Sequence, residues 1–134
     1  MDEAGIAAKA VALVAPYVAK GAEELAKKVG GEVGGRVVKL WDALRVKLQE
    51  RGAGKALANL EAKPEDARRQ AALELELEEA LAADEAFRRK VAALIEAVPE
   101  RDRTAIQQIV NVTGERNITV QTAGTGNRFN VGQR

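Results

Sequence analysis

The sequence predicts an all-α fold: a small helical bundle of four to five helices with a C-terminal tail that is either β-prone (cross-β or amyloid-forming) or disordered. Up to about Arg103 the chain is rich in Ala, Glu, Lys, Leu and Arg, a composition typical of helices, and its apolar residues recur at helical spacing. Beyond Arg103 there is no Leu or Lys, the only acid is Glu115, and Asn, Gln, Thr and Gly dominate. We therefore expect two segments, a helical bundle over 1–103 and a tail over 104–134.

The first helix is expected from Asp2 to Val29, because apolar residues recur there every three or four positions. Pro16 lies inside this pattern and should kink or split the helix. The pairs Gly30-Gly31 and Gly34-Gly35 should then break it, as a loop or as a hinge.

The second helix is expected over Arg36–Arg51, where five apolar residues form one stripe and Gly52 and Gly54 mark the end. These residues are Val37, Leu40, Trp41, Leu44 and Leu48. A short segment over Lys55–Ala62 should bring Leu57 and Leu60 to the core.

Pro64 suits the first turn of a further helix that reaches about Leu81, with Glu65 and Asp66 near its positive end. Within it, 73–77 alternates Leu and Glu like a strand, but the surrounding Ala and Glu content favours a helix. Asp84 is the expected N-cap of the last helix, which Pro99 ends. The expected buried face of that helix comprises Phe87, Val91, Leu94, Ile95 and Val98.

The residue inventory argues against an enzyme. The chain of 134 residues contains no Cys and no His, and Ser is also missing. Acyl-transfer triads, Cys–His pairs and the usual zinc ligands are therefore excluded, and we expect no cofactor and no metal. A carboxylate pair such as Glu74 and Glu78, spaced i,i+4 on one helical face, leaves hydrolysis as a third alternative, although a solvated surface face is the usual explanation of such a pair.

The start of the chain is apolar enough to compare with a membrane segment. Residues Ala4 to Ala19 contain one charge, Lys9. Sixteen helical residues span about 24 Å, short of the roughly 30 Å hydrocarbon core, so a standing transmembrane helix is not expected. Two compatible interpretations remain: a central bundle helix, and a segment stored in the bundle and delivered to a bilayer after a trigger. The residues concerned are Ile6, Val11, Leu13, Val14, Tyr17 and Val18.

The tail contains an internal repeat of the form V-(N/Q)-x-x-G-x-x-N. The copies run over 110–117 and 120–127, so the second begins ten residues after the first, and the two align without a gap. A strand that turns at Gly and continues through Asn is typical of a β-arch. Equal copies can stack as rungs about 4.7–4.8 Å apart, so that Asn111 lies over Gln121 and Asn117 over Asn127. A disordered polar tail and a terminal hairpin packed on the bundle are the alternatives.

On these residues the tail resembles the bacterial amyloid signalling sequences, which are similar to the RIP homotypic interaction motif of animal necroptosis proteins. Val120-Gln121 and Gly124-x-x-Asn127 carry the resemblance, with one extra residue between Gln and Gly. The first part of the chain resembles a Bell domain in size, in position and in its apolar first helix. Bell domains are similar to fungal HeLo domains and to the four-helix bundle of the mixed-lineage kinase domain-like pseudokinase.

The resemblance implies a programmed cell-death effector of bacterial immunity, with self-assembly, membrane targeting and pore formation as its activities. An NLR-like receptor with a matching motif would template the tail, copies of the chain would assemble, and the first helix would reach membrane lipids. It further implies a cytoplasmic protein that moves to the inner face of the plasma membrane on activation. The assembly residues would be Val110, Asn111, Gly114, Asn117, Val120, Gln121, Gly124, Asn127 and Phe129.

The runner-up is an adaptor, a helical oligomerisation module with the same tail and no membrane activity. Nucleic acid is not an expected partner. The net charge is only +1, and the tail offers three Arg and one Phe, a poor platform for stacking bases.

Overall fold

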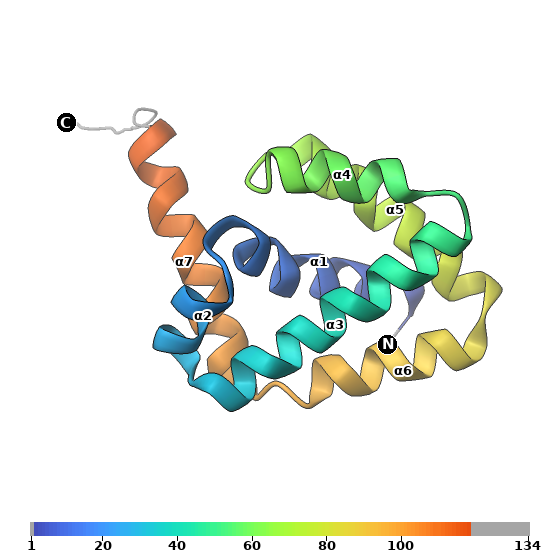
Figure 1. Ribbon diagram of the computed structural model, residues 1–134, viewed down its shortest axis with the longest axis horizontal. Helices are drawn as coiled ribbons and strands as arrows, with labels where there is room; N and C mark the ends of the chain where they lie inside the picture. Colours follow the sequence, from blue (N-terminus) through green and yellow to red (C-terminus); the bar gives the residue numbers. More distant parts are fainter. Residues whose placement is uncertain (1, 119–134) are drawn as a thin grey trace.

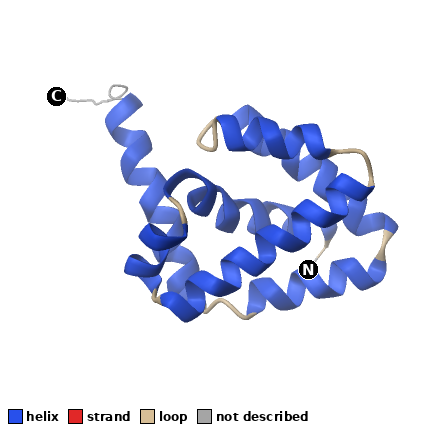
Figure 2. Ribbon diagram, in the orientation of Figure 1, coloured by secondary structure: helices blue, strands red, loops and turns tan. Residues whose placement is uncertain are grey.

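A computed structural model describes the backbone of residues 2–118 and the side chains of residues 2–109. Over this part of the chain all regular structure is helical (Figure 2), which confirms the all-α helical bundle. The described helices number seven rather than four or five. They are α1 (Glu3–Lys20), α2 (Ala22–Val29), α3 (Gly31–Glu50), α4 (Gly54–Ala62), α5 (Ala67–Ala83), α6 (Glu85–Glu96) and α7 (Glu100–Ile118).

Helix α1 lies at the centre, and the other helices surround it (Figure 1). It packs against each of the other six described helices. Because α1 is covered on nearly every side, its small Ala residues are useful: Ala7, Ala10 and Ala15 are all buried and let neighbouring helices come close. The rest of the core is mainly Leu from the surrounding helices, as its largest fully buried side chains show: Leu25, Leu40, Leu44, Leu48, Leu60, Leu73, Leu77 and Leu81.

The break in the first predicted helix comes at Gly21 and not at Pro16. Pro16 lies inside α1, is buried, and is followed by further helix to Lys20. Proline removes one backbone donor from a helix, and here the burial of its ring against the core offsets that loss. Gly21 has φ 91° and ψ 164°, a backbone region open essentially to glycine alone. The chain therefore turns sharply at Gly21 and starts α2.

The pair Gly34-Gly35 does not interrupt a helix, contrary to the sequence-based expectation. Both residues lie inside α3, which begins at Gly31 and so starts five positions before the expected Arg36. Gly34 faces α2, where a Cβ would lie 3.6 Å from the Cα of Ala26. Gly34 is buried and lies beside α2, at a distance where a Cβ would make an ordinary van der Waals contact. The left-handed position is Gly30, with φ 93°.

Aspartate residues cap three of the helices. Asp2 accepts a hydrogen bond from the Gly5 amide at 2.8 Å and starts α1. Asp66 accepts from the Arg68 and Arg69 amides at 2.9 and 3.1 Å, so α5 begins after Asp66 and Pro64 lies in the preceding turn rather than in the first helical turn. Asp84 accepts from the Phe87 amide at 3.1 Å, which confirms the predicted cap of α6.

Helix α7 crosses the composition change near Arg103. It begins after Pro99 and continues to Ile118. Ile106 is fully buried in the core, and Ile109 packs against it. The helical packing therefore includes residues that we expected in the tail. Over 104–118 the described backbone is helical rather than β or irregular.

Candidate functional site

The six apolar residues singled out in the first helix all lie in α1 and are all at least partly buried. Ile6, Val11, Leu13 and Val14 are each no more than 1% exposed. Tyr17 and Val18 are partly buried and pack against the same core. The interpretation of this segment as a central buried helix is confirmed. Its delivery to a membrane stays a prediction, and burial in the resting molecule is what that prediction requires.

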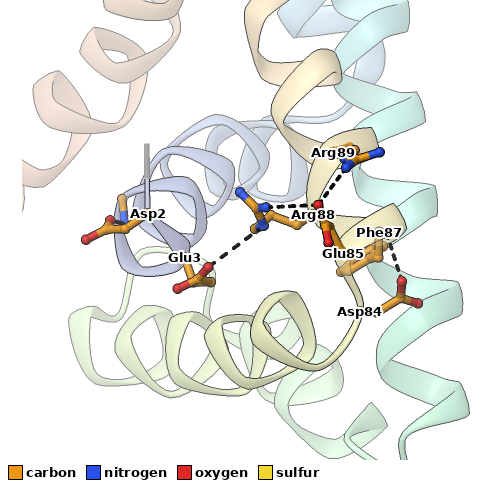
Figure 3. A network of polar contacts seen from close by, with 8 residues as sticks. Asp2, Glu3, Asp84, Glu85, Phe87, Arg88 and Arg89 are labelled. Atoms are coloured by element: carbon orange, nitrogen blue, oxygen red, sulfur yellow. Dashed lines mark hydrogen bonds and ion pairs between the residues drawn. The ribbon is translucent and has the colours of Figure 1, made fainter.

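The N-terminal end of α1 is tied to α6 by charged side chains (Figure 3). Glu3 Oε2 lies 3.8 Å from Arg88 Nε. Arg88 Nη2 lies 3.7 Å from Glu85 Oε2, which in turn lies 2.6 Å from Arg89 Nη2. We call this group of four residues the N-terminal clasp. Its side chains are partly solvent-exposed, so each pair contributes at most about 1 kcal/mol and the clasp orients α1 more than it stabilises the fold.

The C-terminal end of α1 is a one-residue joint. The Gly21 amide donates to the Tyr17 carbonyl oxygen at 2.7 Å and ends α1. The Leu25 amide donates to the Gly21 carbonyl oxygen at 3.1 Å and starts α2. The axes of α1 and α2 are bent by 116° at this point. Leu25 is fully buried and is the residue that anchors α2 to the core.

Among the described helices, none alone is long and apolar enough to span a membrane. The bent pair α1 and α2 reaches that length and composition only when the two helices are taken together. A buried core helix produces the same pattern, so length and composition alone do not mark this pair as a membrane segment.

A groove of about 590 Å³ runs between α3 and α6, away from α1. The two helices are antiparallel and are tied at both ends of the groove. Arg36 Nη1 donates to the Ala97 carbonyl oxygen at 2.6 Å, and Lys47 Nζ donates to Asp84 Oδ2 at 2.6 Å. The groove is lined by Lys39, Asp42, Ala43, Val46, Lys47, Glu50, Asp84, Ala86, Phe87, Lys90 and Leu94.

Lys47 is the central charge of this groove. Its ammonium group lies 5.4 Å from the centre of the Phe87 ring, a cation–π arrangement, and 4.0 Å from Glu50 Oε1. The hydrogen bond from Lys47 is the main reason that the pKa of Asp84 lies below its usual value, and the Phe87 amide acts in the same direction. Beside these polar groups Val46 is 58% exposed, an unusual amount for a large apolar side chain.

The structure bears on two chemical alternatives, a metal site and the carboxylate pair Glu74 and Glu78. No group of three or more acidic side chains within residues 2–109 is placed to hold a metal ion. Glu74 and Glu78 lie together in α5, both partly exposed on its surface. Nothing in the described residues adds a third group to that pair, and a solvated helix face accounts for it.

The predicted assembly residues fall in two places. Val110, Asn111, Gly114 and Asn117 belong to the helical backbone of α7. The second copy of the repeat lies outside the described residues, with Val120, Gln121, Gly124, Asn127 and Phe129. The second copy begins ten residues after the first. Stacking of the two copies as rungs belongs to the assembled state and stays a prediction.

Sequence reasoning missed the clasp and the groove. Glu3 and Arg88 are far apart in the chain, and no periodicity relates them. The groove had one readable signal, since Val46 falls outside the apolar stripe that predicted α3.

Compared with known protein families, curated proteins and solved structures, the chain matches none.

Proposed function

We propose that the chain is an assembly-gated effector that damages membranes. In the resting molecule α1 is stored at the centre of the bundle. Templating of the C-terminal repeat by a receptor with a matching motif, of the NLR-like kind, gathers many copies. Release of α1 then brings an apolar helix to the inner face of the plasma membrane. No catalytic step and no cofactor enters this proposal.

The observation that supports the proposal most is the combination of composition and burial in α1. The helix has a single charge between Ala4 and Ala19, and its large apolar side chains are buried against the six other described helices. A helix with so apolar a surface stays in water only while its partners cover it. Once uncovered it has two ways to bury that surface, a bilayer or a second α1.

The contacts at the two ends of α1 are also compatible with its release from the bundle. At one end the Glu3–Arg88 ion pair, which is partly exposed, contributes little in water. At the other end the chain passes through Gly21, where no atom lies within 4 Å of the position that a Cβ would take. The cost of release therefore lies mainly in the apolar packing of α1, which a lipid environment can replace.

The proposal is tested by dye release from vesicles of phosphatidylglycerol and phosphatidylethanolamine. Purified full-length protein is added with and without preformed fibrils of the 104–134 peptide. We expect release only when fibrils are present. A variant with both Gly124→Pro and Asn127→Ala is the matched control, since it leaves residues 2–118 intact and should fail to join the fibrils.

An adaptor without membrane activity is the second candidate function. The open groove between α3 and α6 favours it, because this surface with its exposed Val46 is accessible while α1 stays in place. An adaptor would co-assemble with the fibrils and release no dye. That outcome of the vesicle experiment would reject the membrane proposal in favour of the adaptor.

A further inference from the structure

The groove side of α3 carries six residues in a regular pattern. In chain order, two charged residues are followed by two apolar residues and then by two more charged residues. Successive members are alternately three positions and one position apart: Lys39, Asp42, Ala43, Val46, Lys47 and Glu50. Positions three and four apart lie on one face of a helix. This face, which we call the α3 face, is therefore a single stripe with charged ends and an apolar middle.

The stripe is complementary to itself when it is reversed. If a second α3 lies antiparallel, with a two-fold axis between Leu44 and Arg45, each position faces a defined partner. Lys39 then faces Glu50 of the other copy, and Asp42 faces Lys47. Ala43 faces Val46 at the centre, small against large. Both pairings occur twice, so four oppositely charged pairs surround an apolar contact.

We propose that the α3 face is a homodimer interface of this antiparallel, two-fold kind. Several alternatives are disfavoured by the same charges. A parallel pairing would set Lys39 against Lys39 and Glu50 against Glu50. An acidic or basic partner would be repelled by half of the stripe, because two cations and two anions alternate along it. A second copy is the occupant that satisfies every position at once.

The charges concerned are largely unused within one chain. Among the described residues Lys39 makes no ion pair. Glu50 has one, at 4.0 Å with Lys47, and Asp42 has one at 3.9 Å with Arg45. Lys47 is the exception, since Asp84 already accepts its hydrogen bond. The outer pairs, between Lys39 and Glu50, should therefore contribute most to recognition.

The interface is small, so the dimer should be weak. Stable interfaces bury at least about 1,200 Å² in total, more than one helix face and its rim provide. Association should rise with protein concentration and fall with salt. Tethering by an assembled tail raises the local concentration to the order of millimolar, where a weak contact becomes occupied. The inference itself rests only on the α3 face and not on the proposed membrane activity.

The test is sedimentation velocity of freshly purified full-length protein over a range of concentrations. Five samples are compared: the unchanged chain, K39E, E50K, the double variant K39E/E50K, and an equimolar mixture of K39E with E50K. Each single change turns two attractive pairs into two repulsive ones, and we expect about tenfold weaker dimerisation. The double variant and the mixture restore opposite charges at every outer pair, and both should regain dimerisation.

The matched control is K28E, the same charge change on the exposed surface of α2. It should dimerise like the unchanged chain. V46D, which places a charge at the centre of the contact, should abolish the dimer while leaving the circular dichroism spectrum unchanged. Equal sedimentation in all these samples, or association that the mixture fails to restore, would overturn the antiparallel dimer and leave the groove to a different partner or to the tail.

Discussion

Asp84 performs two tasks at one carboxylate. It caps α6 through the Phe87 amide and accepts the hydrogen bond of Lys47, so it joins α6 to α3. The cap was predictable, because an acid directly before an apolar periodic segment is a local signal. The bond to Lys47 was not, because it depends on how two helices pack.

The lowered pKa of Asp84 makes part of the stability depend on pH. A carboxyl whose folded pKa is depressed contributes stability above its unfolded pKa of about 3.8, and this contribution is lost as pH falls through the lower folded value. We expect D84N to be less stable than the unchanged chain at neutral pH and the difference to shrink below about pH 4. Urea denaturation at several pH values measures this. A difference that stays constant down to pH 2 would contradict the assignment.

Gly21 and Gly35 permit the same substitution with opposite expected results. Neither glycine has an atom within 4 Å of the site where a Cβ would stand, so only the backbone differs. Gly21 has φ 91°, and an Ala there costs about 1–3 kcal/mol. Gly35 is helical, and G35A should stabilise by about 0.5–1 kcal/mol. Denaturant midpoints of the two variants provide the check, and a stabilising G21A would show that the turn at Gly21 is not strained for other residues.

At the scale of helices, sequence patterns identified most segments and misplaced several ends. The stripe from Val37 to Leu48 predicted α3, and the apolar face from Phe87 to Val98 predicted α6. The errors concern Gly and Pro, whose effect depends on tertiary contacts. Gly34 lies inside α3 beside α2, whereas Gly21 ends α1, and no local rule distinguishes the two glycines.

The stability of the bundle should depend most on α1. Leu13 is 1% exposed at the centre of the molecule, and L13A should cost about 2–5 kcal/mol. V46A is the matched control on the exposed α3 face and should change stability by less than about 0.5 kcal/mol. Charged residues at Ile6 or Leu13 are less useful as a test of function, because they would unfold the bundle. Equal denaturation midpoints for L13A and V46A would contradict the central position of α1.

At the scale of the whole molecule, the sequence predicted a helical bundle and a change of character near Arg103, but not where the packing ends. Helix α7 continues across that point because Ile106 is buried in the core. Composition reports the average chemistry of a segment, whereas one apolar residue in register can extend a helix. The assembled state involves other copies of the chain, which neither the sequence pattern nor a single folded chain contains.

Because α7 is helical and the repeat is proposed to assemble as cross-β structure, part of α7 has to change conformation on assembly. Residues 110–118 have to leave the helix before they can pair as strands, whereas Ile106 holds the first part of α7 in the core. Hydrogen exchange before and after joining fibrils of the 104–134 peptide should show amides of 110–127 becoming strongly protected. Amides of 100–109 should change little. Unchanged exchange over 110–127 in the fibril-bound protein would contradict the role of the repeat.

The central claim is that α1 must leave the bundle for the protein to act on a membrane. The chain has no Cys, so E3C/R88C introduces a unique pair at the clasp, where the native side chains meet at 3.8 Å. A short reductant-cleavable bis-maleimide would then tie α1 to α6. The same variant capped with a monofunctional maleimide is the control, since it lacks the clasp equally but leaves α1 free.

The decisive measurement is fibril-triggered dye release from the same vesicles by the tied and the capped protein. We predict that both join the fibrils, that the capped protein releases dye, and that the tied protein does so only after reductant cuts the link. Equal release by the tied and capped proteins before cleavage would contradict the account, because α1 would then be shown to act, if at all, without leaving its place in the bundle.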